Sequence, residues 1–307
     1  MAYLALASVC FFWGTTYLGI RVALETFPPL TLMATRFLIS GTLMLVLCRA
    51  RGMKMPTWRE AARTAFFGVM ILGVGNGCLT YSEKLISSST AALFIAASPF
   101  WMVGLEAVVP GGERMRAPAL VGIVLGFIGA ALLVAPDVAA RGFAGAMWQG
   151  FLLLQFGCAS WSLGSILQKR RRNESHAFVT GAVQQLATGA VYLGPALAEG
   201  GHEKLLGGGV PLGGWLALAW LVTFGSIIGY NSYIYALEKL PVALVSIYTY
   251  VNPMVAAVLG WFFYREQFGR KEAAAMAVIF LGVTVVKRFT PSPAPWRPAP
   301  LRSSGAP

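Results

Sequence analysis

Long apolar runs separated by short polar connections dominate the sequence. A helix needs about 20 residues to cross the hydrocarbon core of a bilayer, which is roughly 30 Å thick. Eight uncharged runs are long enough to do so, namely Met1–Ile20, Thr64–Ser82, Leu85–Leu105, Ala117–Pro136, Gly142–Gln168, Ala177–Ala198, Leu205–Leu237 and Leu240–Tyr264. Two further runs are less regular, since Thr26–Cys48 contains Arg36 and Ala273–Val286 is short. We therefore expect an all-α, polytopic membrane protein with ten transmembrane helices.

The two halves of the chain repeat the same short motifs. Gly75–Asn76, Glu83–Leu85 and Ser98–Pro99 recur in the second half as Tyr230–Asn231, Glu238–Leu240 and Asn252–Pro253. The pattern predicts one repeat over residues 1–137, a second over residues 138–289 and a disordered cytoplasmic tail over residues 290–307. Five helices per repeat is an odd number, so the second repeat enters the membrane from the opposite side and the repeats are inverted. Such a duplicated membrane chain is typical of a secondary transporter with its site between the halves.

Composition and charge agree with a membrane as the solvent. The chain is 57% hydrophobic and 12% charged, with a mean hydropathy of +0.66, which excludes a soluble domain. The net charge of +12 comes from basic residues in short loops beside helix ends. We attribute it to topology and to anionic membrane lipids rather than to nucleic acid. The distribution of these residues predicts cytoplasmic N- and C-termini in a bacterial inner membrane.

The sequence carries no constellation for catalysis or metal binding. Its four cysteines, Cys10, Cys48, Cys78 and Cys158, lie one per apolar run, as expected of packing residues. Neither a Ser/His/Asp arrangement nor a zinc or phosphate-binding motif occurs. The spacing of Gly122 and Gly126 indicates a helix-packing device rather than a nucleotide loop. We therefore expect no enzyme activity, no cofactor and no metal.

Polar residues at membrane depth are the first candidates for a substrate site, because an unpaired polar group is costly there. Asn76 and Asn231 occupy equivalent positions in the two repeats, and Thr80 and Tyr235 follow on the same helical faces at i+4. Two interpretations stay open: the asparagines line the substrate pathway, or they tie neighbouring helices together.

Aromatic and proline residues give the second set of candidates. Trp13, Trp161 and Trp101 lie well inside their runs, where they either pack the core or form walls for an amphipathic ligand. Tyr250 belongs to a polar stripe on the ninth helix. Pro99 and Pro253 are expected to break the fourth and ninth helices at matching positions, as working hinges or as ordinary kinks.

Arg36 is the one charge well inside a run, and Gln184 takes its place in the second repeat. Its guanidinium would suit a substrate carboxylate, although it could also bond helix-end carbonyls or extend outward along its helix. Every acidic residue lies in a loop or near the end of a run. This favours facilitated diffusion or exchange over proton coupling, with Glu106 leaving the question open.

The chain resembles the EamA-type members of the drug/metabolite transporter superfamily. The resemblance covers roughly residues 3–288 and rests on the inverted repeats, the Trp13–Gly14 opening and the pattern Asn231…Tyr235–Pro241…Asn252–Pro253…Glu266…Gly282 with its degenerate first copy. It implies a central cavity lined by the first, third, fourth, sixth, eighth and ninth helices, with these residues facing it: Trp13, Asn76, Trp101, Trp161, Asn231 and Tyr250.

The resemblance also implies a small-molecule substrate. An exporter of amino acids with large, perhaps aromatic, side chains fits the aromatic residues best, and the lack of paired basic residues at mid-depth disfavours a phosphorylated substrate. Exporters of other amphipathic metabolites or drugs are the alternative, followed by a polytopic membrane enzyme and by a channel or lipid-handling scaffold. The oligomeric state stays open, with a monomer sufficient for this function.

Overall fold

The structure is a computed structural model that describes residues 1–86, 88–109, 116–141, 145–170, 175–201, 203, 207–264 and 270–289. The predicted disordered tail, residues 290–307, lies outside the described residues. All the regular structure in the described part is helical, which confirms the all-α, polytopic class. The elements are α1 (Ala2–Leu24), α2 (Pro29–Ala50), α3 (Trp58–Gly68), η1 (Val69–Asn76), α4 (Gly77–Ser82), α5 (Ser88–Ile95), α6 (Ser98–Val108), α7 (Ala117–Arg141), α8 (Ala146–Arg170), α9 (Ala177–Ala198), α11 (Leu212–Trp220), η2 (Leu221–Tyr230), α12 (Asn231–Lys239), α13 (Val242–Val245), α14 (Tyr248–Tyr264) and α15 (Arg270–Phe289).

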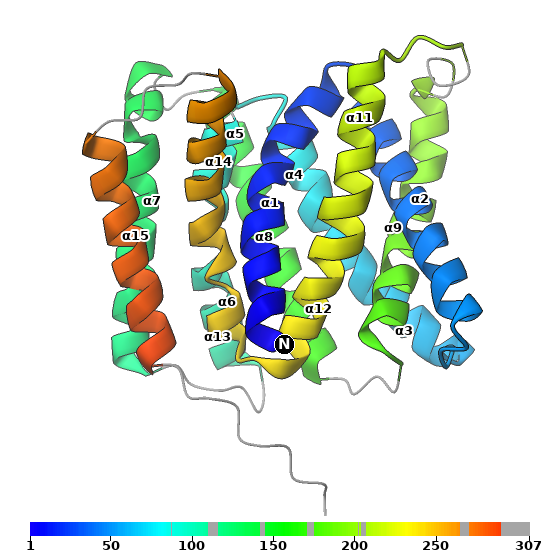
Figure 1. Cartoon of the computed structure of the whole chain (residues 1–307), viewed down its shortest axis with the longest axis horizontal. Coiled ribbons are helices and arrows are strands. Elements are labelled where there is room, and N and C mark those ends of the chain that lie inside the picture. Colours follow the sequence, from blue (N-terminus) through cyan, green and yellow to red (C-terminus); the bar gives the residue numbers. More distant parts are fainter. Residues whose placement is uncertain are drawn as a thin grey trace, which may run out of the picture.

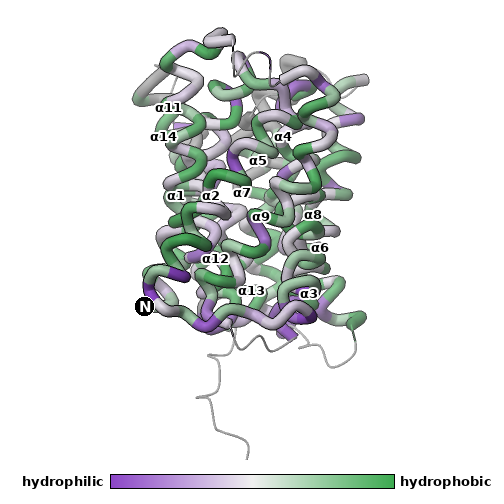
Figure 2. The backbone as a smooth tube through the Cα atoms, turned by 90° about the vertical axis from the view of Figure 1, so that its right-hand side faces the viewer, coloured by the Kyte–Doolittle hydropathy of each residue, from purple (hydrophilic) through white to green (hydrophobic). Residues whose placement is uncertain are grey.

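These elements combine into ten rods that stand side by side (Figure 1). The segments α3, η1 and α4 form one continuous rod, as do α11, η2 and α12, while α5 with α6 and α13 with α14 form two interrupted ones. Within the described residues, five helical stretches have the length and apolar composition to cross a membrane: Ala2–Leu24, Pro29–Ala50, Trp58–Ser82, Ala146–Arg170 and Leu212–Lys239. In Figure 2 the middle of the bundle carries mostly hydrophobic residues. The hydrophilic residues gather mainly at the end of the bundle where the N-terminus lies.

Two rods extend further than their apolar runs. The last helix, α15, adds charged residues at both ends of the Ala273–Val286 run and reaches 20 residues, about 30 Å at 1.5 Å per residue. The fifth rod, α7, continues to Arg141. The repeat boundary expected at residue 137 therefore falls inside a helix, and the connection to α8 begins after it.

The two halves interlock instead of standing apart. The first helix, α1, packs mainly against α14, η2 and α12 of the second half, and its counterpart α8 packs against η1, α6 and α4 of the first. At the two flanks, α2 pairs with α9 and α7 pairs with α15 (Figure 1). Every one of these contacts joins the two halves, so the space between them is walled by both.

Two π-helical segments occupy related positions near mid-depth. In η1 and η2 the backbone bonds from residue i+5 to residue i, a wider turn that is common at functional sites. Side chains from other helices bond the carbonyls of these segments: Ser160 Oγ donates to Met70 O (2.9 Å), Tyr192 Oη to Gly73 O (2.7 Å) and Trp13 Nε1 to Gly225 O (3.0 Å). The irregular turns are thus supported by neighbours, as the hydrocarbon environment requires.

The interruptions of the fourth and ninth rods differ from the expected symmetry. Pro99 is the second residue of α6, directly after the turn at Ala96 and Ala97. That position suits proline, because the first turn of a helix does not use its missing N–H. Pro253 instead lies inside α14, and the ninth rod is interrupted earlier, at Ser246 and Ile247. The two prolines therefore do not mark equivalent breaks, and their role as hinges stays a prediction.

Glycines on α7 bring it into close contact with α15, which confirms the packing interpretation of the Gly122 and Gly126 pair. A Cβ atom at Gly122 would lie 2.7 Å from Val286 N and 2.8 Å from Gly282 O. A Cβ atom at Gly282 of α15 would lie 2.5 Å from Gly126 N. The backbones of the two helices approach so closely only because these side chains are absent.

Gly122→Val is expected to destabilise the protein by about 1–3 kcal/mol, because the valine overpacks this contact. The measurement is the melting temperature of the purified protein in detergent. Gly104→Val is the matched control, since a Cβ atom at Gly104 on α6 meets nothing within 4 Å. Equal melting temperatures for the two variants would contradict the packing role of Gly122.

Candidate functional site

A cavity with about 690 Å³ of space free of atoms lies between the two halves, part of it open to solvent. Its wall comes from α1, α2, η1, α4, α5, α6, α8, η2 and α14, so both repeats contribute to it. The lining is mostly apolar and aromatic, with a few polar groups. The residues that line it are Trp13, Thr16, Tyr17, Arg36, Phe37, Leu72, Gly75, Asn76, Leu79, Ile95, Ser98, Leu154, Gly157, Cys158, Trp161, Gly225, Ser226, Tyr230, Tyr248 and Asn252.

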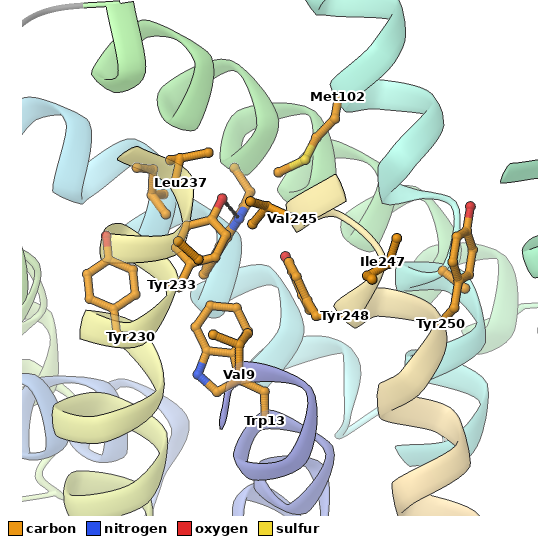
Figure 3. Packing of buried hydrophobic residues seen from close by; sticks show 14 of the residues in the cluster. Val9, Trp13, Met102, Tyr230, Tyr233, Leu237, Val245, Ile247, Tyr248 and Tyr250 are labelled. Atoms are coloured by element: carbon orange, nitrogen blue, oxygen red, sulfur yellow. Dashed lines mark hydrogen bonds between the residues drawn. The ribbon is translucent and has the colours of Figure 1, made fainter. Parts of the chain in front are cut away.

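A cluster of four rings, the aromatic floor, is formed by Trp13, Trp161, Tyr233 and Tyr248. Figure 3 shows Trp13, Tyr233 and Tyr248 side by side. The ring centroids of Trp13 and Trp161 are 5.4 Å apart at an interplanar angle of 84°, an edge-to-face contact between the tryptophans of the two repeats. The ring centroid of Trp13 also lies 5.2 Å from that of Tyr233 and 5.0 Å from that of Tyr248. The floor therefore joins α1, α8, α12 and α14 at one point.

Hydrogen bonds fix the orientation of these rings. Trp161 Nε1 donates to Tyr233 Oη at 2.9 Å, and Tyr233 Oη lies 2.7 Å from Ser165 Oγ. Trp13 Nε1 donates to the carbonyl of Gly225 at 3.0 Å. Because every polar atom of the two indoles has a partner, the rings can present apolar faces without an unpaired N–H at membrane depth.

Asn76 is a polar group that stays available in the cavity. Its side chain is half-buried, and no described residue makes a hydrogen bond to its amide. Two other polar lining groups are already used. Tyr230 Oη donates to Gln184 Oε1 at 2.9 Å, and Asn252, in the orientation that satisfies its amide, donates to Cys10 O at 3.1 Å and Tyr248 O at 3.0 Å. Asn76 is thus equipped to bond a ligand.

Arg36 is the one charged residue among those that line the cavity. It is 4% exposed, its Nε donates to Ser226 Oγ at 2.8 Å, and its Cζ lies 4.9 Å from the centroid of the Phe37 ring. The guanidinium therefore points across to η2 rather than outward along α2.

Asn231, the repeat counterpart of Asn76, does not line the cavity. Its Nδ2 donates to Ile227 O at 2.6 Å and to Met44 Sδ at 2.9 Å, and a side chain at Gly181 would collide with its Oδ1. These contacts place it between α12, α2 and α9, where it ties helices together. Residues in a π-helical turn advance less around the axis than α-helical ones. Because η1 has 8 residues and η2 has 10, equivalent sequence positions emerge on different faces.

Four further sequence candidates also lie outside the cavity lining. Thr80 is buried and donates to Met33 Sδ at 3.4 Å, and Tyr235 is partly buried against the hydrophobic core. Trp101 is 38% exposed and donates to Gln155 Oε1 at 2.9 Å. Tyr250 is fully buried and donates to Ile123 O at 3.0 Å, which anchors α14 to α7. Trp13, Arg36, Asn76 and Trp161 are the predicted residues that the structure brings together.

Three tyrosines of the site are not predicted by the sequence pattern. Tyr230, Tyr233 and Tyr248 all come from the second repeat, and the first repeat has no tyrosine at the matching positions. A comparison of the two repeats selects residues that match, whereas these rings fill space on one side only. A signal is present all the same, since the stretch from 230 to 250 has an unusual density of tyrosine.

Polar contacts close the bundle on the N-terminal side of the floor. Arg170 at the end of α8 forms an ion pair with Glu106 of α6 at 3.0 Å, and Lys169 Nζ donates to Leu240 O at 2.7 Å. The side chains of Val9, Met102 and Val245 are buried close to the rings of the floor (Figure 3). The ion pair, the Lys169 contact and these buried side chains therefore pack the bundle on this side of the floor.

Comparison with known proteins identifies this architecture. The sequence pattern of the EamA-like transporter family matches residues 1–135 and 148–288. This chain belongs to that family. It is a membrane transporter, and its cavity lies between the two parts that match.

Relatives of this EamA-like transporter cover almost its whole length. It is 34% identical over 284 residues to the "Uncharacterized inner membrane transporter YedA" of Escherichia coli strain K12, in a match that covers 92% of this chain and 89% of the relative. A "Probable terminal-alkyne amino-acid exporter" of Streptantibioticus cattleyicolor is 24% identical over 91% of this chain and 90% of its own. One solved crystal structure has a TM-score of 0.72 at 23% identity over 94% of this chain and 98% of its own, which shows a common fold.

The two asparagines of this EamA-like transporter should respond differently to truncation. Asn76→Ala is expected to weaken ligand binding by about 1–2 kcal/mol, roughly 5- to 30-fold, while the melting temperature without ligand is unchanged. Asn231→Ala is expected to lower the melting temperature without ligand and to leave the affinity unchanged, because the Asn231 amide joins three helices. Ligand-induced thermal shifts and unliganded melting temperatures of both variants provide the test, and normal affinity in Asn76→Ala would remove this residue from the site.

Proposed function

We propose that this EamA-like transporter exports amino acids, large or aromatic ones among them, or related small metabolites across the bacterial inner membrane by alternating access. The cavity between the two halves is the observation that carries the proposal. Residues of both halves line it, mostly apolar and aromatic with a few polar groups, and a lining of this kind is typical of small-molecule sites. Aromatic walls with one available amide suit a molecule that has an apolar body and a polar head.

The closed side of the cavity supports a direction. If the N-terminus lies in the cytoplasm, the aromatic floor and the ion pair between Glu106 and Arg170 lie on the cytoplasmic side. We infer that these contacts close this side and that the cavity faces outward. Release to the outside needs this state, and loading from the cytoplasm needs the floor to separate. Because the floor joins helices of both repeats, a movement of one half against the other opens it.

The names of relatives support an amino-acid-like cargo. Besides the Streptantibioticus exporter, the chain is 24% identical to an "S-adenosylmethionine/S-adenosylhomocysteine transporter" of Chlamydia trachomatis over 90% of its length. Both names refer to molecules that contain an amino-acid group. The narrower choice of substrate within this class is a matter for direct measurement.

Radiolabelled counterflow in proteoliposomes is the decisive experiment. Unlabelled amino acid loaded inside is expected to accelerate uptake of the labelled amino acid, since a carrier exchanges one for the other. Neither a channel, a lipid-handling scaffold nor a membrane enzyme shows this acceleration. A panel of aromatic, aliphatic and polar amino acids identifies the cargo, and a panel without any acceleration would contradict the proposed function.

The same exchange is expected to need no proton gradient, because the described carboxylates that have buried oxygens lie at rod ends. Glu106 is paired with Arg170, and Glu83 follows α4 directly. The oxygens of Glu83 are buried without a described hydrogen-bond partner, and this burial raises its pKa, an effect that Arg21 opposes. Substrate-driven proton flux in liposomes that is abolished by Glu83→Gln or Glu106→Gln would contradict independence from protons.

The proposed orientation predicts the labelling of engineered cysteines. Arg59 and Lys84 are exposed at opposite ends of the third rod. In intact cells, a membrane-impermeant thiol reagent should react with Lys84→Cys and spare Arg59→Cys, while both should react after permeabilisation. The unmodified chain serves as the background control, since Cys48, Cys78 and Cys158 are buried. The reverse pattern would invert the topology.

A further inference from the structure

The charge of the cavity is unbalanced. Among the described residues that line it there is one cation, Arg36, and no acidic residue. The ion pair between Arg170 and Glu106 lies at the end of the bundle, and no described carboxylate pairs with Arg36. A buried cation without a counter-ion is unfavourable, so its presence calls for an anion that visits the site.

The hydrogen bonds of Arg36 leave its fork available. A guanidinium has five N–H donors, and Ser226 Oγ takes the one on Nε at 2.8 Å. No hydrogen bond from Nη1 or Nη2 to a described residue is formed. These two nitrogens are the pair that binds a carboxylate with two parallel bonds.

The cation and the aromatic floor adjoin each other through η2. Gly225 accepts a hydrogen bond from Trp13 through its carbonyl, and the next residue, Ser226, holds Arg36. A Cβ atom at Gly225 would lie 2.8 Å from Arg36 Nη2, so the guanidinium rests directly on this backbone. A ligand held by Arg36 therefore has the rings of the floor within reach of an attached apolar group.

The cavity has few hydrogen-bond acceptors available for an ammonium group. Asn76 presents a neutral amide oxygen, while the side chains of Tyr230 and Asn252 are engaged in internal hydrogen bonds. No described lining residue is a carboxylate, so Arg36 would repel a cationic group in this cavity, and only the faces of the aromatic rings would be left to offset that repulsion.

We propose that the cavity selects organic carboxylates with an apolar or aromatic body, which bind through Arg36, and that an α-ammonium group is dispensable. The inference rests on the proposed transport function and narrows its substrate class. Amino acids satisfy it through their carboxylate, and so do aromatic and aliphatic monocarboxylic acids that lack the amino group. Amines of the same shape do not.

The test compares matched ligands on the intact wild-type protein. Binding of 3-phenylpropanoate, phenylalanine, 3-phenylpropanamide and phenethylamine is measured by calorimetry on the purified transporter, with indolyl and branched aliphatic sets of the same four head groups. In at least one set the two carboxylates should bind roughly 10- to 100-fold more tightly than the amide and the amine. Equal or tighter binding of the amine would overturn the inference, and so would carboxylates that fail to bind in all three sets.

Variants assign the effect to Arg36. In Arg36→Gln, which places here the residue type of its repeat counterpart Gln184, the affinity ratio between acid and amide should fall toward one. Arg36→Lys should keep a preference for the acid, although a reduced one. If Arg36→Gln does not fold, Arg36→Lys and the wild-type ligand series still decide. A ratio that stays at the wild-type value in a folded Arg36→Gln would overturn the inference.

The outcome is separable from that of the proposed function. Counterflow with a neutral or cationic substrate, together with weak binding of all carboxylates, would support the transport function and contradict the proposed carboxylate site. Carboxylate binding without any counterflow would support the carboxylate site and contradict the proposed transport function.

Discussion

Every hydrogen-bonding group at membrane depth needs a partner, and this constraint organises the molecule. It selects helices for the backbone, and it explains why the widened turns of η1 and η2 are bonded by Ser160, Tyr192 and Trp13 from other helices. It also gives meaning to exceptions. Buried oxygens of Thr31, Ser162 and Asn231 also lack a described partner, but Asn76 and the fork of Arg36 are unpaired groups that face the cavity. In a solvent that penalises such groups, their position is the strongest indication of where a ligand belongs.

The first helix of each half packs against the other half, and this arrangement determines how the cavity can open and close. Since α1 packs on the second half and α8 on the first, the contact between Trp13 and Trp161 sits where the two halves cross. The rings that would hold an apolar substrate are thus also the rings that close the N-terminal side. Ligand contact and closure involve the same side chains, so occupancy and conformation are linked without a separate relay.

The two repeats share one arrangement of helices, but residues at equivalent positions have different roles in the two copies. Asn76 is available to a ligand, whereas Asn231 joins α12 to α2 and α9. Arg36 lines the cavity, whereas Gln184 bonds Tyr230 and Gln168. A cavity on a pseudo-two-fold axis would bind symmetric ligands if both copies kept the same residues. Divergence at these pairs allows it to distinguish the head of a substrate from its body.

The sequence by itself determined the class of the protein, because the length and charge of each apolar run are matched against a bilayer one segment at a time. It also indicated the duplication, and Trp13, Arg36, Asn76 and Trp161 as candidates for the site. The tertiary structure alone decided which faces meet. The rotation of each rod depends on π turns, on glycine contacts such as that of Gly122 with α15, and on neighbouring side chains. For that reason Thr80, Trp101, Asn231, Tyr235 and Tyr250, all polar or aromatic at suitable depth, point elsewhere, while Tyr233 and Tyr248 complete the floor.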